Sequence, residues 1–181
     1  MYIKKIILSI LITIFIGGCS NLAFNERYNN ASWDKVLIAP FSGDLTTIAE
    51  DEFEHALAIS SKLIVIPAST VKNLLKDEEL ESLYKTNPNK AMFDLADKLH
   101  ANGVVFVKIN AFSPKARHSS DLVSSTVSLN AKLVDINSGS IVASSQHNSS
   151  SIFSSTSKLI HDVSQNAIDD FNKFFDKLNR R

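Results

Sequence analysis

Apolar residues recur at two different periods along this chain, and the change of period predicts its elements. Short, nearly continuous apolar runs at 35–39, 63–66 and 104–109 predict buried strands. The stretch 122–136 instead alternates apolar and polar residues, which predicts a strand with one solvated face. An Asn-Ser-Gly turn follows it and predicts a hairpin into a second strand over 140–149.

Apolar residues spaced three and four apart predict four helical stretches between and after these strands. They are a helix that starts with Thr47 and Glu50 in capping-box spacing, an irregular stretch from Ser69 to about Lys85, a helix opened by Pro88, and a long helix over about 157–178. The predicted order is β-α-β-α-α-β-β-β-α. This order indicates an α/β fold, a mixed three-layer sandwich with a parallel βαβ start and an antiparallel hairpin extension.

The first 18 residues have the pattern of a signal peptide. Lys4 and Lys5 precede an apolar run of about 11 residues, which is shorter than the roughly 20 residues that a membrane span needs. Residues 16–19 read Ile-Gly-Gly-Cys and resemble the lipobox at which bacterial lipoproteins are cleaved and acylated. We therefore predict lipidation, palmitate included, at Cys19. The alternative interpretation is a signal anchor with a chance cysteine.

Cleavage before Cys19 would leave 163 of the 181 residues. Within them we predict a short polar tether over 19–32, with a reach of about 20 Å, and a single domain over 33–181. By resemblance to lipoprotein sorting in Gram-negative bacteria, Ser20 rather than Asp after the cysteine favours the outer membrane. The expected location is the outer membrane, with the protein lipid-anchored and facing the periplasm.

Charge and composition argue against several classes of function. The chain has 19 basic and 19 acidic residues, and loss of Lys4 and Lys5 leaves 17 basic against 19 acidic residues. This balance provides no excess of positive charge for binding nucleic acid. Acylation uses the single cysteine, so no thiol remains for a metal or a nucleophile. The five histidines lack metal-ligand spacing; they are His55, His100, His118, His147 and His161.

Catalytic and nucleotide-binding patterns are weak as well. The chain has no Gly-x-Ser-x-Gly motif, and no Ser-x-x-Lys sequence stands in a nucleophile context. The turn at Gly43 has one glycine, and acidic residues begin the helix after it, which disfavours a bound phosphate. The acidic run 77–81 is interpreted as a solvated helix face rather than a docking surface. We therefore expect no cofactor, no metal and no enzymatic activity.

The most unusual stretch is 119–157, in which fifteen of 39 residues are serine and three are charged. Its final strand is expected at a sheet edge without the Lys or Pro residues that usually protect edges. Two interpretations stay open: a plain Ser/Thr-covered sheet face, or a surface kept uncharged for another protein. The residues of the possible partner surface are Ser140, Ser145, Ser149 and Ser151.

Four segments follow one another as in a group of bacterial envelope domains: KVLIAPFSGD, LIVIPASTVKNLL, LADKLHANGVVFVKI and LNAKLVDINSGSIVASS. In element order and turn positions, residues 33–178 resemble the group that holds the TolB amino-terminal domain, CsgG and LpoB. The resemblance implies a binding or accessory protein for assembly or regulation of an envelope machine, with unidentified envelope proteins as partners. The alternative is a subunit of an oligomeric export channel, although the chain lacks the long inserted hairpins of the curli-export lipoprotein.

Overall fold

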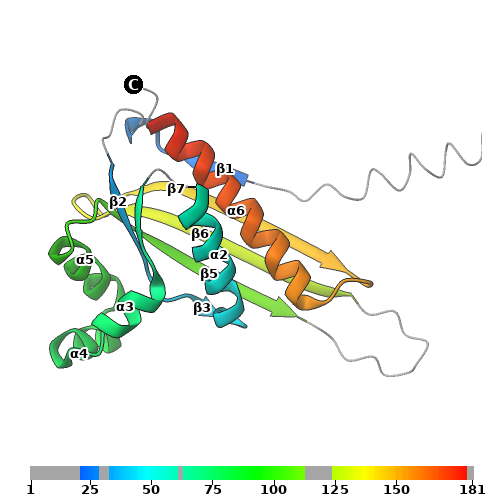
Figure 1. The fold of residues 1–181 in the computed structure, drawn as a ribbon, viewed down its shortest axis with the longest axis horizontal. Helices are drawn as coiled ribbons and strands as arrows, with labels where there is room; N and C mark the ends of the chain where they lie inside the picture. Colours follow the sequence, from blue (N-terminus) through cyan, green and yellow to red (C-terminus); the bar gives the residue numbers. More distant parts are fainter. Residues whose placement is uncertain (1–20, 29–32, 61–62, 113–123, 179–181) are drawn as a thin grey trace, which may run out of the picture.

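Seven strands pair into one mixed sheet, in the order β1-β7-β6-β5-β2-β4, with β3 also paired to β5 (Figure 1). The structure is a computed structural model that describes residues 21–28, 33–60, 63–112 and 124–178. From the amino end, the elements are β1 (Asn21–Phe24), η2 (Glu26–Tyr28), β2 (Lys35–Ile38), β3 (Ser42–Gly43), α2 (Thr46–Ser60), β4 (Ile64–Ile66), α3 (Ala68–Leu74), α4 (Glu78–Thr86), α5 (Pro88–Lys98), β5 (Gly103–Phe112), β6 (Ser125–Asp135), β7 (Ile141–Ser151) and α6 (Thr156–Leu178).

The predicted fold class is confirmed. Strand β2 pairs in parallel with β4 and β5, whereas β5, β6 and β7 form an antiparallel meander. The short strand β3, which the sequence analysis treated as a turn, also runs parallel to β5. Gly43 has a φ of +106°, and a Cβ there would lie 1.7 Å from the carbonyl oxygen of Ile109. Only glycine therefore allows this close pairing.

The predicted tether contains ordered structure. Residues 21–24 form β1, which pairs antiparallel with β7 from Asn21 opposite Gln146 to Phe24 opposite Ala143. The Phe24 ring lies 6.5 Å from that of Phe174, and Lys177 Nζ lies 3.9 Å from the centre of the Phe24 ring. The prediction of a plain tether over 19–32 is thus wrong for the strand and for η2 after it. Strand β1 also covers part of the β7 edge that was expected to be bare.

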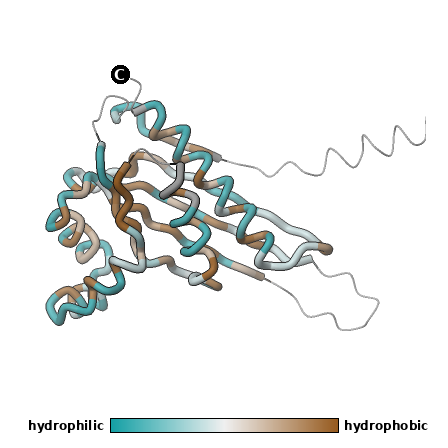
Figure 2. The backbone as a smooth tube through the Cα atoms, in the orientation of Figure 1, coloured by the Kyte–Doolittle hydropathy of each residue, from teal (hydrophilic) through white to brown (hydrophobic). Residues whose placement is uncertain are grey.

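Helices α2 and α6 pack on one face of the sheet (Figure 1). Their apolar stripes meet each other as well as the strands, and Phe53 of α2 and Phe171 of α6 make an edge-to-face contact at 6.2 Å. The predicted packing of the carboxyl-terminal helix is therefore confirmed. In Figure 2 the short strands β2 and β4 are largely brown, whereas α2 and α6 alternate between brown and teal.

The predicted capping box at the start of α2 is absent, because Glu50 has other partners. Its side chain is buried, and one carboxylate oxygen accepts a 2.8 Å hydrogen bond from the backbone N–H of Phe41. The other oxygen pairs with the ammonium of Lys72 on α3. A buried carboxylate needs such compensation, and here it links α2 to the strand β2 exit and to α3.

The opposite face of the sheet is only partly covered. Helices α3, α4 and α5 pack near β2 and the start of β5, around a second apolar cluster. The fully or nearly buried residues of that cluster are Leu37, Ala39, Val71, Leu75, Leu80, Met92, Leu95, Ala96, Ala101 and Val104. Beyond Phe106 this face of β5 carries exposed polar side chains, contrary to the expectation of a fully covered strand.

Candidate functional site

The uncovered part of the sheet presents a polar surface that we call the open face. It consists of Lys108, Asn110, Thr126, Ser128, Asn130, Lys132, Gln146 and Asn148, all exposed or half-buried. These residues alternate with buried ones along β5, β6 and β7, as expected when one side of a strand meets the core and the other meets solvent. In the register, Lys108 lies opposite Asn130, which lies opposite Gln146, so the side chains form rows across the strands.

A groove of about 510 Å³ lies between the open face and the helices α4 and α5. Its floor includes Lys108, Asn130, Lys132 and Gln146. The helices contribute Tyr84, Pro88, Asn89 and Met92, and β5 contributes Phe106. The volume is in the range of ligand sites. The arrangement offers ammonium, amide and hydroxyl groups beside a few apolar surfaces.

The electrostatics of the groove favour negative charge. No Asp or Glu is among its lining residues, and within the described part of the chain neither Lys108 nor Lys132 has an ion-pair partner. Burial raises the pKa of Tyr84 above its usual range, so the phenol stays protonated and can donate a hydrogen bond at neutral pH. The groove therefore suits an acidic ligand or an acidic segment of a partner.

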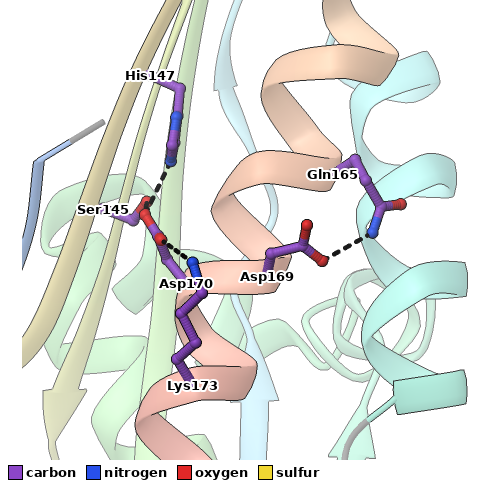
Figure 3. A network of polar contacts seen from close by, with 6 residues as sticks. All are labelled: Ser145, His147, Gln165, Asp169, Asp170 and Lys173. Carbon is purple, nitrogen blue, oxygen red and sulfur yellow. Dashed lines mark hydrogen bonds and ion pairs between the residues drawn. The ribbon is translucent and has the colours of Figure 1, made fainter. Parts of the chain in front are cut away.

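A second polar cluster joins β7 to α6 (Figure 3). Ser145 Oγ donates a 2.8 Å hydrogen bond to Asp170 Oδ2, and His147 Nε2 lies 2.9 Å from the same oxygen. Lys173 Nζ lies 3.5 Å from Asp170 Oδ1. Ser145, His147 and Asp170 are all buried.

The cluster contains the residue types of a hydrolase triad but not its geometry. In a triad the histidine stands between the acid and the nucleophile, whereas here Asp170 accepts from both Ser145 and His147. Figure 3 shows both side chains pointing to the one carboxylate. We interpret the cluster as a link that satisfies a buried charge between strand and helix.

The predicted partner surface is not one exposed surface. Ser145 is fully buried and bonded to Asp170, so its assignment as a partner-contacting residue is wrong. Ser149 and Ser151 are half-buried, and Ser140 lies before β7 and donates its backbone N–H to Ser138 Oγ. The exposed polar residues of β7 on the open face are Gln146 and Asn148. Sequence reasoning missed the open face, although its two lysines signalled an exposed side.

The remaining features considered in the sequence analysis are not among the residues described for the groove or for the cluster around Asp170. Among the residues that the structure describes, no three His, Cys, Asp or Glu side chains gather in a way that could hold a metal. His161 Nδ1 lies 2.8 Å from Glu52 Oε2 and joins α6 to α2. Cys19 and His118 lie outside the described residues. Within the same described part, no helix is long and apolar enough to cross a membrane.

Comparison with known proteins gives the fold a wider context. No family model and no curated protein matches this sequence. PelC from Paraburkholderia phytofirmans, solved as a dodecamer, is 15% identical, with 86% of this chain and 99% of that chain covered and a TM-score of 0.55. Lipoprotein GNA1162 from Neisseria meningitidis is 18% identical, with 77% and 99% covered and a TM-score of 0.53. The chain shares its fold with both proteins.

LpoB, which the sequence resemblance names, is also among the similar structures. The LpoB C-terminal domain from Salmonella enterica is 15% identical, with 65% of this chain and 83% of that chain covered and a TM-score of 0.45. The similarity to TolB and CsgG stays a prediction. What is established is an α/β fold that occurs in a bacterial lipoprotein.

Proposed function

We propose that this protein is a lipid-anchored, periplasm-facing binding protein that serves the assembly or regulation of a cell-envelope machine. The groove on the open face carries the proposal. Its lining is rich in amides and hydroxyls and holds two lysines, but includes neither a carboxylate nor a histidine. Such a lining suits recognition, since general acid–base catalysis at neutral pH usually relies on His, Asp or Glu. Binding is therefore proposed in preference to catalysis.

The membrane contact is proposed to be the acyl chains on Cys19, at the outer membrane. The sequence around Cys19 and the serine that follows it support this part of the proposal. Two or more acyl chains give stable anchoring without a polybasic segment. Mass spectrometry of the native protein should find the acyl groups on Cys19, and Cys19→Ser should yield a soluble or unprocessed form. Normal processing and membrane retention of that variant would contradict the proposal.

The partner is proposed to be an envelope component that presents negative charge to Lys108 and Lys132. A photo-reactive residue at Gln146, on the floor of the groove, should capture this partner in living cells. The matched control is the same photo-reactive residue at Asn166, which is exposed on α6, on the other side of the sheet. A capture pattern that is identical at the two positions would contradict a role for the groove.

A second function is supported by one specific observation. PelC, solved as a dodecamer, shares the fold over 99% of its own length. This favours the alternative in which many copies of the present protein form a ring that belongs to an export channel. The mass of the native, lipidated protein in mild detergent separates the two possibilities. A closed ring of many copies supports the channel subunit, whereas a monomer supports the accessory protein.

A further inference from the structure

One end of the sheet exposes large apolar side chains. Phe153 is 89% exposed, Phe112 is 67% exposed and Ile152 is 44% exposed. Phe112 ends β5, and Ile152 and Phe153 directly follow β7. Because Phe112 lies opposite Thr126 and Ser125 lies opposite Ser151, both sites are at the same end of the three-stranded meander. We call Phe112, Ile152 and Phe153 the apolar tip.

The apolar tip belongs to a larger concentration of apolar groups. Leu45 and Ile48, at the start of α2, are also exposed. Asp44 Oδ2 accepts a 3.0 Å hydrogen bond from the backbone N–H of Ala111, which places the start of α2 at this end of the sheet. Five of the eight large hydrophobic side chains that are exposed in the described part of the chain thus lie here. Figure 2 shows the segment after β7 in brown at one extremity of the molecule.

The tip is held in place and carries no charge. Ser151 Oγ accepts 3.0 Å hydrogen bonds from the backbone N–H groups of Phe153 and Ser154, which fix the turn after β7. Residues 148–157 include no Asp, Glu, Lys or Arg. The segment that carries Ile152 and Phe153 can therefore enter an apolar phase without desolvating an ionised side chain of its own.

The path of β1 brings the lipidation site toward the same end. Strand β1 runs antiparallel to β7 and begins at Asn21, opposite Gln146. The first residue of β1 therefore lies at the end of β1 that is nearer the apolar tip. Its partner Gln146 lies about 17 Å along β7 from Ser151. Cys19 precedes Asn21 by two residues, which span at most about 7 Å. Acyl chains on Cys19 would hold a bilayer within a short distance of Phe153.

We propose that the apolar tip inserts into the interfacial layer of the bilayer that receives the acyl chains of Cys19. Aromatic side chains favour the boundary between headgroups and acyl chains, at a depth of about 5–10 Å for interfacial segments. The tip then supplies a second contact that fixes the orientation of the domain, with the sheet end at the membrane and α4 and α5 distant from it. This inference rests on the proposed lipidation of Cys19.

The test uses the lipidated full chain in vesicles of phosphatidylethanolamine and phosphatidylglycerol that contain acyl-chain-brominated lipid. In one variant, Phe153→Trp, the tip carries a fluorescent reporter. The control, Ile141→Trp, places the same reporter at the opposite end of β7, where Ile141 is 48% exposed. The native Trp33 is buried, and the parent protein gives its background. We expect a blue shift and strong quenching of the reporter at 153 and neither effect at 141.

Each other result overturns the inference in a distinguishable way. Vesicle flotation with equal or no quenching at the two positions overturns the tip contact and leaves the lipid anchor intact. A blue shift at 153 without quenching by brominated lipid means that another protein copy covers the tip, and also overturns it. Failure of the protein to float, or absence of acyl groups on Cys19, overturns the proposed anchor together with the tip contact.

Discussion

The two faces of β5, β6 and β7 use the same strands for opposite purposes. On one face, buried residues such as Ile109, Leu129 and Leu133 contact the apolar stripes of α2 and α6. On the other, Lys108, Asn130 and their neighbours meet solvent beside the groove. Because adjacent residues of a strand point to opposite faces, the residues that stabilise the core and those of the proposed binding surface occupy alternate positions. Single substitutions at neighbouring residues can therefore separate them.

The largest expected effect compares two neighbours on β5. Ile109→Ala removes a fully buried side chain and should lower the free energy of unfolding by about 2–5 kcal/mol. Lys108→Ala, on the open face, should change it by less than about 0.5 kcal/mol. Denaturant unfolding of the two variants and the parent measures both values. Equal losses in the two variants would mean that the open face is packed against something and is not free.

A smaller effect tests the polar link that fastens β7 to α6. Asp170→Ala leaves Ser145 and His147 without their buried acceptor and should cost about 1–3 kcal/mol of unfolding free energy. The control is Asp169→Ala, since Asp169 is exposed at the adjacent position of α6 and its only hydrogen-bond partner among the described residues is Gln165. That variant should lie within about 0.5 kcal/mol of the parent. Similar stabilities for both variants would show that the link contributes nothing.

On the open face, substitution should affect binding and leave stability unchanged. Removal of both positive charges, in a Lys108→Gln and Lys132→Gln double variant, should weaken capture of an acidic partner roughly two- to thirtyfold, because exposed ion pairs contribute about 0.2–1 kcal/mol each. A double variant of two exposed lysines elsewhere, Lys98→Gln and Lys158→Gln, is the control. Titration of the captured partner with each double variant and with the parent measures the affinities to be compared. Equal weakening in both variants would point to net charge and not to the groove.

The order of the main elements could be predicted because their signals are local. The apolar runs and the helical spacing of the carboxyl-terminal segment give strand and helix directly. Strand β1 could not be predicted, since its four residues pair through backbone hydrogen bonds with β7, which lies more than a hundred residues away in the sequence. Strand β3 has two residues and depends on the close approach of Gly43 to Ile109. No periodic pattern of apolar residues predicts this approach.

The candidate site was harder to predict for a related reason. Serine is tolerated on either face of a strand, so a serine-rich strand does not reveal which side is buried. Along β7 the register shifts by one residue at Val142, where both Val142 and Ala143 are buried. This shift places Ser145 under α6 and Gln146 over the groove. A one-residue change in register exchanges the two faces of a strand, and only the pairing with β6 reveals it.

The smallest expected effect concerns pH and the covered side of the molecule. Burial raises the pKa of Glu54 on α2 above its ordinary value of 4.5, although its side chain accepts a hydrogen bond from the backbone N–H of Ser69. The folded protein thus holds this proton more tightly than the unfolded chain does. The resulting stabilisation is present below pH 4.5 and is lost as the pH rises through the folded-state pKa.

Glu54→Gln keeps an acceptor for Ser69 and removes the charge. The variant should therefore be slightly more stable than the parent at pH 7, and the difference should shrink as the pH falls toward 4.5, where the parent is protonated as well. Denaturant unfolding at several pH values measures this slope, with Glu26→Gln, exposed in η2, as the control. A stability difference that does not vary with pH would place the ionised carboxylate of Glu54 in solvent. It would also show that α2 covers the sheet less tightly near Glu54. The difference in burial between the covered face and the open face of the sheet would then be smaller than the buried residues indicate.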